Sequence, residues 1–277
     1  MHTFMASFDD EYCDEGNLGR SPGEFSLVLA RMLRAAEAPE IEDFGGDRYA
    51  AALRDLRLRL GRYASPVQVS RWVSALRLYF FFLVWEAGHR SRGSVPDLDE
   101  YAMSRIDTGS MRTHLMVLDV IDGYEVPATE MEQIEVRALV EIMATVIGWD
   151  NDIFSQYKES VRDSGSWNLI SILARERHYS HAEALTDAVA MRDRVVTLFL
   201  LLRAKVSAHA SAELRRYLES VGGWIPANID WSLTSGRYPN PDDLPQFADF
   251  LAAGPSDTST QPLPIPSIAW WWGLLGD

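Results

Sequence analysis

Cysteine is nearly absent from this sequence, in which Cys13 is the single example among 277 residues. One cysteine cannot form a disulfide within the chain, which fits a reducing compartment. Basic residues are scarce as well, with 26 Lys and Arg against 40 Asp and Glu, so that the net charge is −14. Because phosphate backbones are bound by basic surfaces, this charge argues against a nucleic-acid partner.

Long hydrophobic runs are also lacking. The longest, residues 78–85, has eight residues, whereas a membrane-spanning helix needs about 20. No basic segment followed by an apolar stretch opens the chain, as it would in a secretory signal. We therefore expect a cytoplasmic protein without stable membrane insertion. Its 47% content of hydrophobic residues is enough to fill a substantial core.

Alternating hydrophobic patterns bounded by tight turns are nearly absent, so no β-sheet is expected. Apolar residues instead recur at three- and four-residue spacing, which predicts helices over residues 25–38, 49–64, 67–88, 131–160, 180–210 and 212–236. Ser180 followed by Glu183 is a capping box, which predicts a helix start. We expect an all-α, single-domain bundle over residues 1–277, with helices in 1–240 and a proline-rich tail at 241–277.

One polar cluster lies in the middle of a predicted helix, within WDNDIFSQYKES. Asn151, Ser155 and Glu159 are spaced four residues apart, which places their side chains on one helix face. An amide oxygen, a hydroxyl and a carboxylate are hard oxygen ligands, which suit Mg²⁺ better than zinc. Lys158 lies beside Glu159, where it could contact an anion held by the metal. A solvated polar helix face is the alternative interpretation.

A second acidic cluster lies at the start of the chain, within FDDEYCDEG. It contains Asp9, Asp10 and Asp14. An acidic terminus is usually a solvated tail, but the same stretch carries Phe4 and Phe8. This stretch is therefore either a solvated end or part of a packed element, and the residues alone leave both interpretations open.

These two clusters resemble the metal-binding motifs of class I terpene synthases of bacterial type. FDDEYCDEG is similar to the aspartate-rich motif in its D-D-x-x-x-D variant, and NDIFSQYKE to the second motif, (N/D)-D-x-x-S/T-x-x-x-E. SGRY at 235–238 resembles the Arg-Tyr pair that lies near the C-terminus of these enzymes. YAMSRIDTGS at 101–110 resembles the segment that carries their diphosphate-sensing arginine. The intervals of 142 residues from Asp9 to Asn151 and 86 from Asn151 to Arg237 also match that layout.

The resemblance implies a role for each matching residue. Asp9, Asp10, Asp14, Asn151, Ser155 and Glu159 would bind three Mg²⁺ ions, with Mn²⁺ as the alternative metal. Arg105 would sense the diphosphate, Thr108 would be the linker, and Gly109 would be the effector whose carbonyl faces the substrate. Lys158, Arg237 and Tyr238 would donate hydrogen bonds to the diphosphate, and Trp231 would line the pocket.

The function implied is that of a sesquiterpene cyclase, a carbon–oxygen lyase acting on phosphates. Its substrate would be a prenyl diphosphate, with farnesyl diphosphate as the expected length. Metal binding would allow diphosphate to leave, and the resulting carbocation would cyclise in an apolar pocket. The resemblance leaves a homodimer open.

Three alternatives remain at this point. Only eight residues precede Asp9, whereas several helices do so in the family, so the bundle is expected to lack its N-terminal helices. A truncated, inactive chain that binds metal and diphosphate poorly is therefore one alternative. Prenyl-chain-elongating synthases are another, although they use two aspartate-rich motifs. An all-α interaction module is the third, and it does not explain the order of the motifs.

Overall fold

The computed structural model describes residues 1–14, 16–42, 45–162, 167–235, 238 and 254–276. Within these ranges the ordered elements are helices and no strand occurs, so the all-α prediction is confirmed. The chain divides into two compact units. The first comprises Met1–Val95 and Asp107–Ala128, and the second comprises Pro96–Ile106 and Thr129–Asp277.

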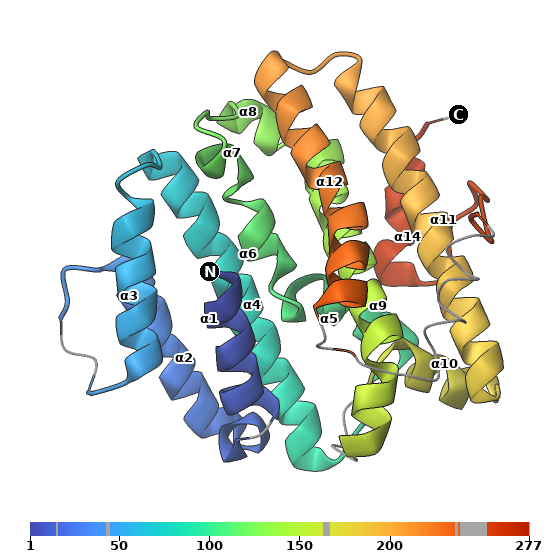
Figure 1. Ribbon diagram of the computed structural model, residues 1–277, viewed down its shortest axis with the longest axis horizontal. Helices are drawn as coiled ribbons and strands as arrows, with labels where there is room; N and C mark the ends of the chain where they lie inside the picture. Colours follow the sequence, from blue (N-terminus) through green and yellow to red (C-terminus); the bar gives the residue numbers. More distant parts are fainter. Residues whose placement is uncertain (15, 43–44, 163–166, 236–237, 239–253, 277) are drawn as a thin grey trace. The chain divides into compact units, whose positions relative to one another are not determined.

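The first unit begins with α1 (His2–Phe8), which continues directly into the π-helix η1 (Asp9–Asp14). A 3₁₀ helix, η2 (Asn17–Arg20), precedes the longer helices α2 (Pro22–Glu37), α3 (Arg48–Leu60) and α4 (Pro66–Arg92). Two short helices, α6 (Met111–Leu115) and α7 (Leu118–Ile121), complete the unit. Helix α2 packs against both α3 and α4, as Figure 1 shows.

The core of this unit is aromatic. Phe8 is fully buried and lies within 6.5 Å, ring centre to ring centre, of Tyr49 on α3 and of Tyr79 on α4. Trp72 on α4 and Phe25 on α2 are buried in the same cluster. The first residues therefore form a packed helix rather than a solvated tail.

Side-chain caps explain where several helices begin. The Ser65 side chain accepts the backbone N–H of Gln68 and the Gln68 side chain accepts that of Ser65, which forms a capping box before Pro66. The predicted box of Ser180 and Glu183 is present at the start of α11 (His181–Ser207). Because the first backbone N–H groups of a helix lack internal partners, these caps fix the helix starts.

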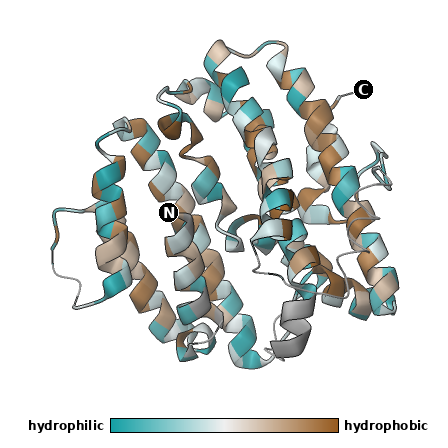
Figure 2. Ribbon diagram, in the orientation of Figure 1, coloured by the Kyte–Doolittle hydropathy of each residue, from teal (hydrophilic) through white to brown (hydrophobic). Residues whose placement is uncertain are grey.

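The second unit is organised around α9 (Ile134–Arg162), which packs against α10 (Leu169–Arg177), α11 and α12 (Ala212–Thr234). Helix α5 (Leu98–Thr108) begins in this unit, and α8 (Ala128–Met131) lies at the boundary of the two units. Figure 2 shows both hydrophobic and hydrophilic residues along these helices, as amphipathic packing requires. Apolar side chains of α9, among them Leu139, Met143 and Trp149, are completely buried.

The end of the chain differs from the prediction of a proline-rich tail, because it contains the helix α14 (Pro266–Gly273). Trp271 is fully buried and donates a hydrogen bond from Nε1 to Glu141 on α9 at 3.1 Å. Pro266 stands in the first turn of α14, where proline is tolerated, so proline content alone did not exclude a helix.

Helix α4 is, within the described ranges, the one helix long and apolar enough to cross a membrane by length and composition. Half of its most apolar window is buried inside the protein. A core helix meets the same criteria, so this finding is weak evidence for a membrane segment.

Candidate active site

The polar face of α9 begins with Asn151 and Ser155, which lie one turn apart on a regular helix. Asn151 is half-buried, and Ser155 is 4% exposed. Lys158 and Glu159 belong to the same helix, but their side chains lie outside the described ones. The structure thus places two predicted metal ligands on one face, and both offer oxygen atoms.

Arg105 on α5 is directed at this face. Its Nη2 donates to the Gly148 carbonyl at 3.1 Å, to Asn151 Oδ1 at 3.0 Å and to Asp152 Oδ1 at 2.6 Å. The predicted diphosphate sensor and a predicted metal ligand are therefore in direct contact. The guanidinium is largely buried, which strengthens its interaction with the carboxylate compared with a pair in water.

Asp152 was not among the predicted site residues, although it lies inside the quoted motif. Its buried carboxylate accepts hydrogen bonds from Arg105, from the Tyr101 hydroxyl on α5 and from the Leu169 amide, the last at 2.9 Å. Three donors to one carboxylate fix its orientation. The spacing of Tyr101 and Arg105 at i and i+4 was the signal that could have identified them as a pair.

Gly148 also escaped the sequence analysis. A Cβ atom at this position would lie 3.1 Å from Arg105 Cγ and 3.2 Å from Arg105 Nε. Such contacts are shorter than ordinary van der Waals separation, so any larger residue would displace the arginine. The glycine allows the Arg105 side chain to lie directly on α9.

Tyr238 contacts the same helix. Its hydroxyl accepts a hydrogen bond from Asn151 Nδ2 at 2.6 Å. The Trp231 ring, on α12, lies 5.9 Å from the Tyr238 ring in an edge-to-face arrangement. Arg237 lies outside the described residues. Asn151 therefore uses both its amide oxygen, to Arg105, and its amide nitrogen, to Tyr238.

The residue before Asn151 anchors α9 to α11. Arg192 donates from Nε to Asp150 Oδ1 at 2.7 Å and from Nη2 to Asp150 Oδ2 at 3.2 Å. Burial raises the pKa of the Asp150 carboxyl, and the two-pronged contact with Arg192 opposes that shift. Consecutive residues of α9 thus have different tasks, because Asp150 fixes the helix and Asn151 faces the site.

The segment after Arg105 contains the predicted linker and effector. Helix α5 ends at Thr108, Gly109 forms a turn, and Ser110 adopts a positive φ of 57°. The helix therefore ends just before Gly109, and the left-handed residue Ser110 redirects the chain. Thr108 is buried, and Asp107 accepts from Arg112 Nε at 2.7 Å.

The N-terminal acidic motif occupies η1, in the other compact unit. Asp9 is half-buried, whereas the side chains of Asp10 and Asp14 lie outside the described ones. Glu11 points elsewhere, since its carboxylate accepts from the Tyr49 hydroxyl at 2.7 Å and pairs with Arg48. The Tyr49 hydrogen bond and the nearby Arg48 lower the pKa of Glu11. π-Helical turns occur frequently at functional sites.

The donor chemistry of α9 fits a hard divalent cation. Asn151 and Ser155 offer neutral oxygen atoms of the kind such a cation prefers, and the Asp152 carboxylate is already engaged by three donors. Among the side chains that the structure describes, no three His, Cys, Asp or Glu residues cluster as a metal site. The described side chains do not include those of Asp10, Asp14 and Glu159, so their roles as metal ligands stay predictions.

Comparison with known proteins gives consistent matches. Residues 1–197 match the family model described as terpene synthase family 2, C-terminal metal binding. A germacradien-6-ol synthase of Streptomyces pratensis is 38% identical over 99% of this chain and 78% of its own length. A (+)-T-muurolol synthase of Streptomyces clavuligerus, described as cyclising farnesyl diphosphate, is 37% identical over 99% of this chain and 66% of its own length. The crystal structure of the ancestrally reconstructed SVS_A2 protein aligns with a TM-score of 0.85, at 35% identity, over 97% of this chain and 76% of its own.

Proposed function

This chain belongs to the terpene synthase family that binds metal through its C-terminal domain, and on that premise we propose that it is a Mg²⁺-dependent sesquiterpene cyclase. Its substrate would be farnesyl diphosphate, since a relative of 37% identity is described as cyclising that compound. The products would be a cyclic hydrocarbon or alcohol and inorganic diphosphate. We further propose that residues 1–277 act as one catalytic domain, in the cytoplasm and without a nucleic-acid partner.

The contact of Arg105 with Asn151 and Asp152 is the observation that carries this proposal. Asp152 holds the guanidinium at the polar face of α9, with one nitrogen shared among three oxygen acceptors. Arg105 has further N–H groups in a planar fork, a geometry that matches phosphate oxygens. Its position therefore suits a diphosphate that is bound beside the α9 face.

A divalent metal, when bound, supplies Lewis-acid neutralisation of the diphosphate charge. Asn151, Ser155 and Glu159 would hold it on α9, and Asp9, Asp10 and Asp14 are the proposed ligands of the other motif. We propose three Mg²⁺ ions, with Mn²⁺ able to replace them. Asn151 is oriented for this role because Tyr238 and Arg105 fix its two amide atoms.

The remaining residues would bind the substrate and exclude water. Tyr238 and Arg237 would donate hydrogen bonds to the diphosphate, together with Lys158 and Arg105. The Trp231 ring, packed edge-to-face against Tyr238, would stabilise positive charge in the hydrocarbon chain by about 0.5–2 kcal/mol. Thr108 and the carbonyl of Gly109 would follow Arg105 toward the reacting carbon. A homodimer is compatible with each of these roles.

The proposal is tested by incubating the protein with Mg²⁺ and geranyl, farnesyl or geranylgeranyl diphosphate and analysing volatile products by mass spectrometry. We expect a cyclic C15 product from farnesyl diphosphate, and none when EDTA replaces Mg²⁺. The Asn151→Ala and Arg237→Ala variants should release none either. Asp55→Asn, which alters an exposed ion pair on α3, is the matched control and should retain activity.

Two outcomes would contradict the proposal. Failure of the folded protein to release any product from the three substrates would leave the inactive alternative. A longer linear prenyl diphosphate, formed when isopentenyl diphosphate is added, would instead identify a chain-elongating synthase.

A further inference from the structure

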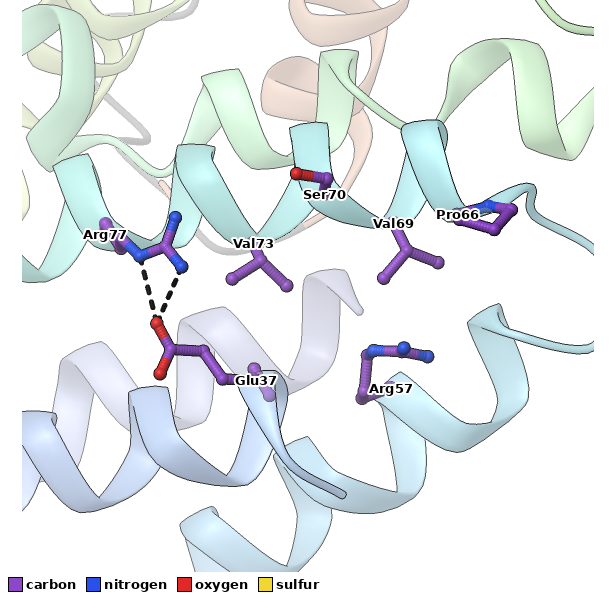
Figure 3. A pocket seen from close by; sticks show the side chains of 8 residues that line it. Glu37, Arg57, Pro66, Val69, Ser70, Val73 and Arg77 are labelled. Carbon is purple, nitrogen blue, oxygen red and sulfur yellow. Dashed lines mark hydrogen bonds and ion pairs between the residues drawn. The ribbon is translucent and has the colours of Figure 1, made fainter. Parts of the chain in front are cut away.

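A groove lies on the first compact unit, between α2, α3 and α4, and none of the proposed active-site residues lines it. Its cavity volume is about 420 Å³, and its lining comprises Ala36, Glu37, Arg57, Pro66, Val69, Ser70, Val73 and Arg77. Figure 3 shows Val69 and Val73 between two polar ends. Arg77 and Glu37 form one end, and Arg57 lies at the other, near Pro66.

The two ends differ in charge. Arg77 is neutralised, because its Nε and Nη2 donate to Glu37 Oε1 at 3.1 and 2.7 Å. The Arg57 side chain makes no hydrogen bond or ion pair with any residue that the structure describes, and its Nε is buried without a partner. The Nη1 and Nη2 atoms are not buried in the same way, so the Arg57 end of the groove presents an accessible cation that can donate hydrogen bonds to an acceptor on a ligand.

The sequence around Arg57 is basic in an otherwise acidic protein. Residues 54–77 contain six arginines and one acidic residue, Asp55, whereas the whole chain has a net charge of −14. Most of these arginines have acidic partners, as in the pairs Arg59–Asp55 at 2.8 Å and Arg71–Asp119 at 2.6 Å. Arg57 is the arginine of this segment that combines a groove position with the absence of such a partner among the described residues.

The floor between the two ends is apolar. Val69 and Val73 are 8% and 5% exposed, and they lie one helical turn apart on α4. One turn of four residues rises about 6 Å, which is the length of a chain of about five carbon atoms. Ser70 is a further lining residue of the groove.

We propose that this groove is a binding site for a small amphipathic anion, with a phosphate or carboxylate head at Arg57 and a short hydrocarbon body on Val69 and Val73. The guanidinium would donate two parallel hydrogen bonds to the head. The valine floor would bury the body, and the neutralised Arg77–Glu37 pair would close the other end. This site requires no divalent metal, which separates it from the proposed active site.

Gly61 adds a way to test the position of the Arg57 guanidinium. A Cβ atom at Gly61 would lie 2.8 Å from Arg57 Nη1. Gly61 has a φ of −65°, which any residue adopts, so alanine is tolerated by the backbone. The Gly61→Ala change should therefore move the flexible end of Arg57 without removing its charge.

The experiment is isothermal titration calorimetry of the whole protein with hexyl phosphate, in a buffer that contains EDTA. Inorganic phosphate and hexanol are titrated separately, because they represent the anionic head alone and the hydrocarbon body alone. Hexyl phosphate should bind the wild type at millimolar concentration or tighter, and both fragments should bind more weakly. The Arg57→Gln change should weaken the binding of hexyl phosphate about tenfold or more. The Gly61→Ala change should weaken it severalfold. Arg62→Gln, which removes an exposed arginine of the same segment outside the groove, should leave the affinity unchanged.

A titration with sodium hexanoate in place of hexyl phosphate distinguishes a carboxylate head from a phosphate head. Binding of either compound supports a site for an amphipathic anion. Thermal unfolding of each variant establishes that it is folded. Absence of metal-free binding of both compounds would overturn the proposal. It would also fail if Arg57→Gln and Arg62→Gln weakened binding equally, or if hexanol bound as tightly as hexyl phosphate. Because EDTA and a short alkyl chain are used, none of these results depends on cyclase activity.

Discussion

The motif on α9 and the motif on η1 have the same proposed task but different backbones. On α9 the helix is regular, and the contacts of Asn151 follow from a four-residue spacing and from donors on α5. On η1 the backbone is π-helical, so residues five apart, such as Asp9 and Asp14, are separated by about one turn. In an α-helix the same five residues would advance about 500°, which would place them on different faces.

The two motifs are also supported differently. On α9, the acidic neighbour Asp152 is turned toward the site arginine and is held by Tyr101. On η1, the acidic neighbour Glu11 is turned toward Tyr49 and Arg48, and the Cys13 carbonyl accepts from Arg90 Nη1 at 2.9 Å. The comparison shows that the α9 contacts orient polar side chains toward one another, whereas the contacts of η1 hold an irregular backbone turn in place.

Asp152→Asn tests the α9 side with the largest expected effect. The change keeps the shape and removes the charge that faces Arg105, which leaves a largely buried guanidinium unpaired. We expect cyclase activity to fall about 10–100-fold and the free energy of unfolding to fall by about 3 kcal/mol. Steady-state kinetics and urea unfolding measure the two quantities, with Asp55→Asn as the exposed control. Unchanged kinetics would mean that Asp152 serves stability alone.

Gly148→Ala tests whether the position of Arg105 matters beyond its charge. The added methyl group would meet Arg105 Cγ at 3.1 Å and push the guanidinium from its acceptors. A fall of about tenfold in kcat is expected, because displacement by a fraction of an ångström disrupts such sites. Gly223→Ala, where a Cβ would meet no atom within 4 Å, is the matched control. Equal kinetics for both variants would argue against a positioning role for Gly148.

A matched pair of tyrosine changes compares the two motifs directly, because each hydroxyl donates to a carboxylate inside a proposed metal-binding motif. Tyr101→Phe should reduce kcat severalfold by loosening Asp152. Tyr49→Phe should instead reduce the free energy of unfolding by about 1 kcal/mol, with a smaller change in kcat, since its hydroxyl also holds the Ser7 carbonyl at 2.9 Å. The reverse pattern would contradict the comparison.

The smallest expected effect lies in the C-terminal segment, outside both motifs. Partial burial raises the pKa of Asp257, but the Ser259 amide and Arg194 outweigh it, so the pKa of Asp257 is lowered overall. A lowered folded pKa means that the stabilisation is present above the unfolded pKa of about 3.9 and is lost as the pH falls below it. The melting temperatures of wild type and Asp257→Asn should differ slightly at pH 6 and converge as the pH falls through the lowered pKa of Asp257. A difference in melting temperature that does not change with pH would contradict the conclusion that ionised Asp257 stabilises the folded protein.

The helices and the α9 face could be predicted because their causes are local. Four-residue spacing defines a helix face, and the Ser180–Glu183 box defines a start. The π-helical turn of η1 could not be predicted, because tertiary contacts with Tyr49 and Arg90 stabilise it. Asp152 and Gly148 were missed because their importance depends on Arg105, more than 40 residues earlier. The helix α14 was missed because its stability depends on burying Trp271.

The central claim is that the α9 face binds diphosphate through Mg²⁺. It is tested most directly by the Mg²⁺-dependent binding of inorganic diphosphate, measured by isothermal titration on wild type and on Asn151→Ala. The account predicts that Mg²⁺ strengthens diphosphate binding to the wild type and that Asn151→Ala loses at least about tenfold of that affinity. Binding that is independent of Mg²⁺, or equal in the two proteins, would contradict it.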